Sequence, residues 1–379
     1  MSTTTLIFLS PHDPTNVLNW SGTLTSLYQA LENETGAESL RKIDGGWLDS
    51  AAQQVNRILY HLGLRFDCRY STAFAMCAGL YTSARLLFVP DGLIIAVAAS
   101  NYVPYLFTRR RIIYISDATF RAAAKLYPTL KALPTWLHRQ FDNNEARTLH
   151  KAEAIILPSK WAAESAELDY GVERARIFEI PFGANIPNHL IDKYYQQKSI
   201  ERGDVNLLFV SADWKRKDGD KAVDICRTLL RQGVAARLAI VGDAPEHVRK
   251  LDFVDAKGFL KKTNEAQLAE LCRAYREAHF LVLPTRADAS PIVFSECRAF
   301  GVPPITHDVG GTSSAISHGD TGLLLPLQAT PEQFAEELLT YISDPALYGA
   351  LSEKCRLWYL EKAQWRNWSH LIISLAAPR

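Results

Sequence analysis

The sequence lacks the features that mark membrane-spanning, secreted and nucleic-acid-binding proteins. No apolar run approaches the roughly 20 residues that an α-helix needs to cross a bilayer. The N-terminus, MSTTTLIFLS, has no basic segment of the kind that opens a signal peptide. The formal net charge is only +1, which offers no excess of positive charge to a phosphate backbone. We therefore expect a cytoplasmic protein that does not bind nucleic acid, and contact with a membrane surface stays open.

The cysteines show neither a disulfide framework nor a metal-ligand pattern. There are 6 of them, scattered with no C-x-x-C pair and no histidine cluster nearby. Reduced, buried thiols are therefore expected. The 379 residues are too many for one small core, and 47% apolar with 22% charged residues is an ordinary globular composition. Two domains of ordinary size fit this length.

Short apolar runs alternate with segments of helical period from end to end, which is typical of α/β proteins with parallel sheets. The first series of expected strands covers residues 5–10, 93–100, 111–117, 152–159 and 175–181, and the second covers 205–213, 236–245, 279–288 and 303–311. Polar residues 185–204 separate the two series and are interpreted as a linker. We expect one domain over 1–190, a second over 203–355, and a C-terminal helix within 356–379 that packs back on the first.

The stretch LPTRADASPIVFSECRAFGVPPITHDVGG, residues 283–311, has the strongest indications of a site. Asp288 follows a buried strand, and ligands of doubly wound folds bind at the carboxyl ends of the strands. Ser290 is expected to cap a helix whose first residue is Pro291. The backbone N–H groups of Ile292 and Val293 would then face outward at a helix N-terminus, where anions bind.

Glu296 lies eight positions after Asp288 and about a turn and a half into the expected helix. From there its carboxylate can reach a ribose diol. Two acids at this spacing are equally typical of a helix cap followed by a solvated side chain. The spacing alone therefore leaves both interpretations open.

With these segments in view, RADASPIVFSECRAFGVPPITHDVGG resembles the E-x7-E region of retaining glycosyltransferases of family 4. Members of that family have the GT-B fold, with two Rossmann-like, doubly wound domains facing a central cleft, and use nucleotide-activated sugars. The resemblance implies that the first acid contacts the donor sugar and the second holds the nucleotide ribose. Asp288 stands in place of the usual first glutamate, whereas Glu296 matches.

Two further segments of the second half resemble the same family. LFVSADWKRKDGDKAVD is similar to the strand and turn that grip the donor diphosphate, which places Lys217 on the phosphates and Arg216 beside it. Ala212 stands where the family often has an arginine. The segment KGFLKK is similar to a loop around the nucleobase, which implies that backbone groups near Gly258 and Leu260 read the base.

The first half resembles the family less sharply. Gly22, in NWSGTLTSLYQAL, stands at the family's glycine turn before the first helix, close to the donor phosphates. Asp117, in YISDATF, stands where many relatives carry a histidine near the transferred sugar. Capping the helix that starts near Thr119 is an equal alternative for Asp117. His12 and His307 are the nearest histidines, and a loop role is favoured for His12.

The resemblance implies a glycosyltransferase that moves a sugar from a UDP- or GDP-linked donor to a hydroxyl of a saccharide or glycolipid, with retention of configuration. No cofactor is implied, and no metal, because no D-x-D motif stands in a suitable place; DGD at 218–220 is assigned to a turn. Two alternatives remain. One is a GT-B phosphorylase or epimerase, and the other is a degenerate protein that binds sugar nucleotides without turnover.

Overall fold

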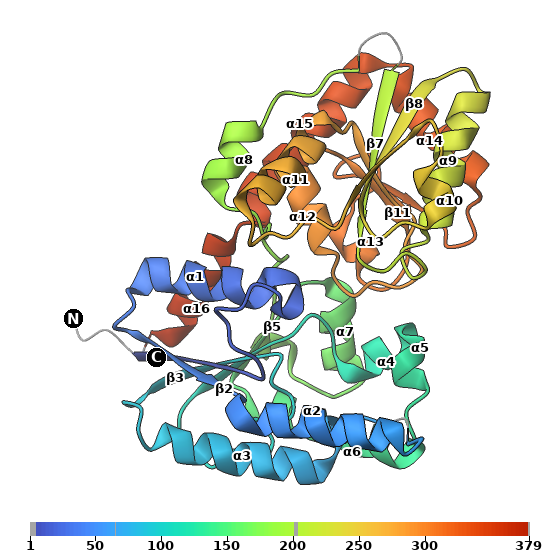
Figure 1. Cartoon of the computed structure of the whole chain (residues 1–379). Coiled ribbons are helices and arrows are strands. Elements are labelled where there is room, and N and C mark those ends of the chain that lie inside the picture. The colour runs from blue at the N-terminus through green and yellow to red at the C-terminus, as the bar shows by residue number, and fades with distance from the viewer. Residues whose placement is uncertain (1–4, 65, 201–203, 378–379) are drawn as a thin grey trace. The chain divides into compact units, whose positions relative to one another are not determined.

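The computed structural model describes residues 5–64, 66–200 and 204–377. The chain forms two compact units. Unit 1 consists of Met1–Pro181 and Trp365–Arg379, and unit 2 of Phe182–Gln364 (Figure 1). No helix in the described ranges is long and apolar enough to cross a membrane.

Unit 1 contains a six-stranded parallel sheet in the order β2-β1-β3-β4-β5-β6. The strands are β1 (Thr5–Ser10), β2 (Leu40–Asp44), β3 (Gly92–Val97), β4 (Ile112–Ile115), β5 (Ala154–Leu157) and β6 (Ile177–Glu179). The central strands are apolar on both faces because helices cover both sides of a parallel sheet. Strand β2, with the charged sequence LRKID, was not expected; it lies at the sheet edge, where Arg41 and Lys42 are exposed to solvent.

The helices of unit 1 include one from the far end of the chain. They are α1 (Thr23–Thr35), α2 (Gly46–His61), α3 (Thr72–Leu86), α4 (Phe120–Leu126), α5 (Pro128–Lys131), α6 (Thr135–Lys151), α7 (Lys160–Leu168) and α16 (Trp365–Ala376), with 3-10 turns η1 (Asn19–Gly22), η2 (Cys68–Tyr70) and η3 (Arg174–Arg176). Helix α16 packs on α1 (Figure 1). The buried Trp368 anchors it, and its indole Nε1 donates to the Pro181 carbonyl at 2.9 Å.

Unit 2 contains a second six-stranded parallel sheet, in the order β12-β11-β10-β7-β8-β9. Its strands are β7 (Asp204–Ser211), β8 (Ala235–Gly242), β9 (Val254–Gly258), β10 (Phe280–Leu283), β11 (Pro304–His307) and β12 (Leu323–Leu325). Its helices are α8 (Asn188–Tyr194), α9 (Gly219–Arg231), α10 (Glu246–Arg249), α11 (Glu265–Glu277), α12 (Ile292–Ala299), α13 (Thr312–Ala315), α14 (Pro331–Ile342) and α15 (Pro345–Lys362). The expected parallel α/β architecture is confirmed in both units.

Each sheet has a point where the chain reverses its direction of winding. In unit 2 the chain runs outward from β7 through β8 to β9, then returns to add β10 on the other side of β7. In unit 1 the corresponding point lies between β1 and β3. At such points the loops that follow neighbouring strands diverge and leave a crevice at the carboxyl ends, where ligands bind in this class of fold.

The segment interpreted as a linker, residues 185–204, lies within unit 2. It contains α8, and its described residues Ile191 and Ile200 are buried in the core of unit 2. The Lys198 ammonium donates to the last carbonyls of α11, at 3.0 Å from Tyr275 O and 2.9 Å from Ala278 O. The burial of this segment could not be predicted from the sequence, because its buried residues are single positions among polar ones. The expected helix within 356–379 is likewise two segments, since α15 ends in unit 2 and α16 belongs to unit 1.

Candidate functional site

A buried ion pair spans the switch point of unit 2. Lys217 follows β7, and Asp288 follows the neighbouring strand β10. The Nζ of Lys217 forms an ion pair with Oδ2 of Asp288, although the two residues are 71 positions apart. Both are nearly removed from solvent, at 8% and 6% exposure. The fold therefore brings together two residues that the sequence assigned to the donor pocket.

Arg216 lies beside this pair. Its Nε is 3.0 Å from Oδ2 of Asp213, and its Nη1 donates to the Ala287 carbonyl at 2.9 Å and lies 3.9 Å from Oδ2 of Asp288. Burial, and then the positive charge of Arg216, lower the pKa of the Lys217 ammonium. The negative charge of the Asp213 carboxylate opposes this shift. A second anion placed beside these two cations would be attracted in the same way.

Backbone hydrogen bonds fix the loops that carry the pair. The Arg286 N–H donates to the Arg216 carbonyl at 2.9 Å, and the Arg286 side chain holds Asp218 at 2.8 Å. The Gly311 N–H donates to the Asp288 carbonyl at 2.9 Å. Gly310 has a φ of 60°, a left-handed conformation in which glycine is favoured. The Gly310–Gly311 turn thus lies against Asp288.

The start of α12 differs from the sequence prediction. Pro291 is the N-cap, in an extended conformation, and no side chain caps the helix, so Ser290 lies outside it. The prediction that Ser290 caps a helix starting at Pro291 was wrong, because the ψ of Pro291 is 104°, which places this residue before the first turn. Phe294 N donates to Pro291 O at 3.0 Å. The N–H groups of the half-buried Ile292 and Val293 precede it and have no acceptor within the helix.

Glu296 lies inside α12 with only 1% of its surface exposed. One carboxylate oxygen accepts from the Lys262 ammonium, and the other accepts from the Tyr275 hydroxyl at 2.9 Å. The Tyr275 ring stacks on Phe300 at a centroid distance of 5.4 Å. Sequence reasoning missed both partners. The segment KGFLKK contains Lys262, but nothing in it distinguishes this lysine from a surface residue.

The two residues assigned to the base lie at the end of β9, on the outer edge of the sheet. Gly258 pairs with Val241 of β8 and has a φ of 70°, with no atom within 4 Å of the position that a Cβ would take. Leu260 is half-buried and packs against the core of unit 2. The Gly258 backbone is therefore open to approach, whereas the Leu260 side chain has a structural contact.

In unit 1 the candidate residues meet around the loop before α1. Gly22 is the N-cap of α1, with φ 87°, and the two preceding residues, Trp20 and Ser21, also have positive φ values of 47° and 57°. Three left-handed residues in a row, two with a Cβ, are costly and occur where the surroundings require them. Asp117 is half-buried and forms a hydrogen bond with the Trp20 side chain; burial raises the pKa of Asp117, and this bond opposes the rise. The side chain that caps α4 is that of Thr119, not Asp117.

A buried acid at the start of α4 was not found from the sequence. Glu145 of α6 is 2% exposed, and its carboxylate accepts from the Phe120 N–H at the start of α4 and from the Tyr170 hydroxyl at 3.0 Å. Burial raises the pKa of Glu145 to about 7. The sequence LHRQFDNNEARTLHK gives no sign that this position is inside.

The two histidines considered from the sequence have structural partners. His307 is fully buried, with ring nitrogens 3.1 Å from the Thr285 carbonyl and 3.1 Å from the Lys221 ammonium. Burial, followed by the charge of Lys221, lowers the pKa of His307. His12 is in the loop after β1, and its Nδ1 lies 3.3 Å from Oδ2 of Asp49 in α2. In the described ranges, no group of three or more His, Cys, Asp and Glu residues is arranged to hold a metal ion.

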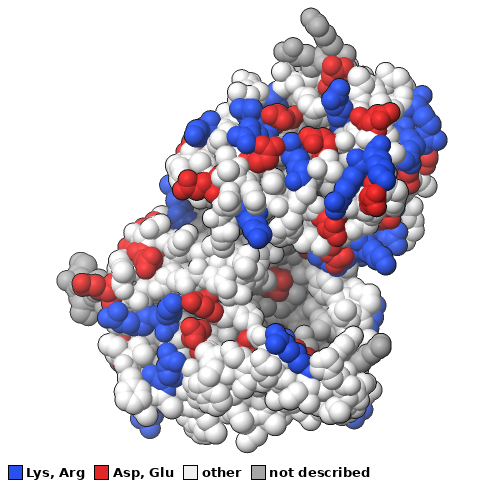
Figure 2. All heavy atoms as spheres, viewed as in Figure 1, with Lys and Arg blue, Asp and Glu red and all other residues white. Residues whose placement is uncertain are grey.

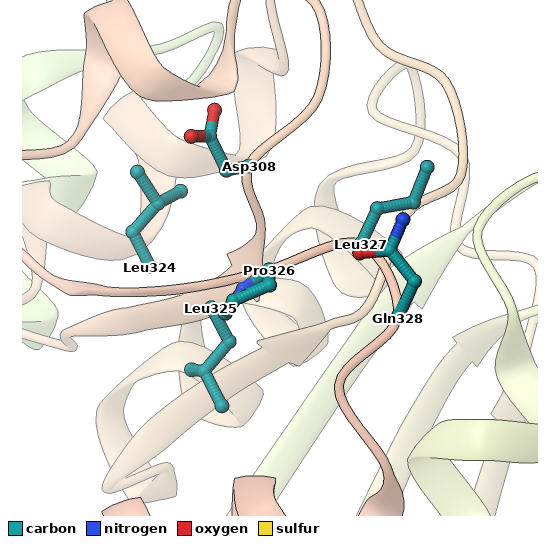
Figure 3. Close-up of a pocket in the computed structure, with 6 residues that line it drawn as sticks. All are labelled: Asp308, Leu324, Leu325, Pro326, Leu327 and Gln328. Carbon is teal, nitrogen blue, oxygen red and sulfur yellow. The ribbon is translucent and has the colours of Figure 1, made fainter.

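A pocket of about 450 Å³ in unit 2 lies away from the predicted residues. Figure 3 shows Asp308 and Leu324 on the left and Leu327 and Gln328 on the right, with Leu325 and Pro326 between them. The Asp308 N–H donates to Leu325 O at 2.7 Å, so the pocket lies where β11 and β12 end. None of the residues assigned to the donor site from the sequence lines this pocket.

Comparison with known proteins finds similarity to glycosyltransferases. Residues 191–358 match the family described as "Glycosyl transferases group 1". Over 288 residues the chain is 22% identical to D-inositol 3-phosphate glycosyltransferase of Gordonia bronchialis, covering 71% of this chain and 59% of that relative. The chain thus spans about three fifths of the length of this curated relative.

Two solved structures are similar over nearly the whole chain. WaaG, a glycosyltransferase involved in lipopolysaccharide biosynthesis, is 15% identical with a TM-score of 0.62, covering 99% of this chain and 100% of WaaG. HepE of Anabaena, solved in complex with UDP and glucose, is 13% identical with a TM-score of 0.62, covering 98% of this chain and 99% of HepE. The chain therefore has the α/β GT-B fold, and its second unit matches the group 1 glycosyltransferases.

Proposed function

We propose that this protein is a retaining glycosyltransferase of the E-x7-E type, which moves a sugar from a nucleotide-diphosphate sugar to a hydroxyl of a saccharide or glycolipid. The observation that carries the proposal is the Lys217–Asp288 ion pair at the switch point of unit 2, within the segment that matches the group 1 family. The α/β crevice at this point is where a nucleotide ligand is expected.

In this proposal Lys217 and Arg216 bind the diphosphate together with the first N–H groups of α12. Breaking the bond between sugar and phosphate leaves negative charge on the phosphate, and fixed positive groups stabilise it as it develops. The diphosphate would draw the Lys217 ammonium from Asp288. That exchange would leave the Asp288 carboxylate able to accept from sugar hydroxyls.

Glu296 would hold the nucleotide ribose, although its carboxylate already accepts from Lys262 and Tyr275. A carboxylate offers about four lone-pair positions, so it can accept further hydrogen bonds from a diol. Base contacts are assigned to the backbone at Gly258. In unit 1, Gly22 and Asp117 would approach the phosphates and the transferred sugar.

A protein that binds sugar nucleotides without turnover is the second candidate, favoured by Ala212 in place of an arginine and by Asp288 in place of a glutamate. A melting-temperature panel with UDP, GDP, ADP and their sugar conjugates tests binding, because a ligand of the folded state raises the apparent stability. Release of the nucleoside diphosphate from the stabilising sugar conjugate then tests turnover.

The proposal predicts a shift with one base and release of that diphosphate. A shift without release, with saccharide and glycolipid acceptors present, would favour the binding protein. The absence of any shift at millimolar nucleotide would contradict both candidates.

A further inference from the structure

Helix α2 carries an apolar stripe on its outer side. Trp47, Ala51, Val55 and Ile58 recur every three to four residues and therefore lie along one face of the helix. All four are exposed, and Trp47 and Ile58 have 67% and 59% of their surface in solvent. Toward unit 1, α2 buries Asp49 and Ala52. The helix thus turns Trp47, Val55 and Ile58 toward solvent, whereas Leu48 packs against the core.

Helix α3 continues this surface. Met76 and Leu80 of α3 are 49% and 57% exposed, and Leu87 and Phe88, the two residues that follow the helix, are 83% and 87% exposed. The two helices adjoin, because the rings of Trp47 and Tyr81 are 6.1 Å apart. Of the 19 large apolar side chains exposed in the described ranges, 10 lie between positions 47 and 88. Soluble monomers rarely gather so many in one place.

Among the described residues of 46–90, the exposed side chains that carry a formal charge are all basic. Between positions 46 and 90 the acids are Asp49, which is buried, and Asp67, which is half-buried and holds Arg69 at 2.6 Å. Arg57 and Arg85 are exposed among the apolar side chains. The next acid, Asp91, pairs with Arg110 at 3.1 Å. The surface over α2 and α3, low in unit 1 in Figure 2, is largely white.

We propose that the α2–α3 face, formed by Trp47, Val55, Ile58, Met76, Leu80, Leu87 and Phe88, binds the surface of a lipid bilayer that contains anionic lipids. Apolar side chains that project from adjoining surface helices can enter the boundary between head groups and acyl chains. Trp47 and the 66% exposed Tyr60 suit this boundary because their rings are apolar with one polar atom.

The exposed arginines favour a bilayer over a second copy of the chain as the binding partner of this face. Two copies packed through this face would bring the arginines of one toward those of the other, and no exposed carboxylate between 46 and 90 is there to pair with them. Anionic head groups supply the missing charge at the same depth as the arginines. This proposal goes beyond the glycosyltransferase activity and does not depend on it.

Flotation of the full-length protein with vesicles tests the proposal. We compare phosphatidylcholine vesicles with phosphatidylcholine and phosphatidylglycerol at 7:3, at low and high salt. The wild-type protein should float with the anionic vesicles, and salt should weaken this binding. The triple variant Ile58→Gln, Leu80→Gln, Leu87→Gln should lower the ratio of bound to free protein at least tenfold. Replacing Arg57 and Arg85 by alanine should lower it by about fivefold per arginine, on anionic vesicles only.

The matched control replaces three exposed leucines of unit 2, Leu347, Leu357 and Leu360, by glutamine. It should float like the wild-type protein, and all variants should keep the wild-type melting temperature because the replaced side chains are exposed. Failure of the wild-type protein to float would overturn the proposal, as would equal loss in the control. A dimer in sedimentation that the Ile58, Leu80 and Leu87 substitutions dissociate, without flotation, would assign the face to a second copy instead.

Discussion

At the scale of single residues, the position of Lys217 explains why a lysine is placed where burial disfavours its charge. The ion pair with Asp288 holds the Lys217 ammonium in the crevice before any ligand arrives, so in the proposed role only a short shift toward the diphosphate is needed. In the proposed role, Lys217 stabilises charge that develops during the reaction. Removing the Lys217 side chain should therefore affect turnover more than binding.

Lys217→Ala should lower kcat by about 100- to 1,000-fold, the range typical of losing one fixed group that stabilises developing charge, and should weaken nucleotide binding much less. Steady-state kinetics and calorimetry with the diphosphate measure the two effects. Lys221→Ala is the control, because the Lys221 ammonium contacts His307 and the Ala329 carbonyl rather than Asp288. Equal kcat values in the two variants would rule out the assigned role.

Glu296 allows a second prediction at this scale, since hydrogen bonds to a charged group contribute roughly 1.5 to 3 kcal/mol each. Glu296→Gln should raise the Kd of the preferred nucleotide by about 10- to 100-fold. A nucleotide without the 2′ and 3′ hydroxyls should bind the wild-type protein and the variant with similar Kd values. If the variant loses the same factor with this analogue, Glu296 does not contact the ribose.

At the scale of elements, Glu145 joins three helices of unit 1. From α6, its carboxylate accepts from the first N–H of α4 and from Tyr170, just after α7. The Tyr170 hydroxyl also contacts Asp142 of α6 at 2.9 Å, and Asp142 holds Arg121 of α4 at 2.8 Å. This network fixes the start of α4, three residues after Asp117.

The raised pKa of Glu145, about 7 against 4.5 for the free side chain, makes unit 1 less stable at higher pH. The folded state binds the proton more tightly, so the stability contributed by the protonated acid is complete below pH 4.5 and is lost as pH rises through 7. The shift corresponds to roughly 3 kcal/mol. Urea unfolding of wild type and Glu145→Gln between pH 5 and 8 should show a difference that changes with pH in this direction. Parallel curves would contradict the shift.

At the scale of the whole molecule, the regular parts of the fold were predictable and the isolated contacts were not. All nine expected strands exist, and most are buried on both faces, which requires a run of apolar residues. The edge strands β2, β9 and β12 were not expected. Strands β2 and β9 contain charged residues, and β12 has only 3 residues. Lys217 and Asp288 were named from a resemblance, and only the strand order explains why they meet.

Other features depend on contacts between distant segments and leave little trace in the sequence. Glu145, Tyr275 and Lys198 are polar residues in polar surroundings along the chain, yet each is buried with specific partners. Ser290 shows the opposite case, in which a strong local signal for a helix cap is overridden because Pro291 is extended. The position of α16 at the end of the sequence likewise gives no sign that this helix belongs to unit 1.

That last helix gives a prediction for the molecule as a whole. Trp368 is fully buried in unit 1 and holds the Pro181 carbonyl, so Trp368→Ala should remove a large packed side chain and leave that carbonyl without its donor. Such losses typically cost about 3 to 5 kcal/mol. Hydrogen exchange should therefore become faster in β1, β3 and α1, while β7 and β8 of unit 2 keep their wild-type rates. Trp358→Ala, in α15 of unit 2, is the matched control and should leave the exchange of unit 1 unchanged. If Trp368→Ala speeds exchange equally in both units, the chain unfolds as one cooperative body, and the stability of unit 2 cannot be separated from that of α16.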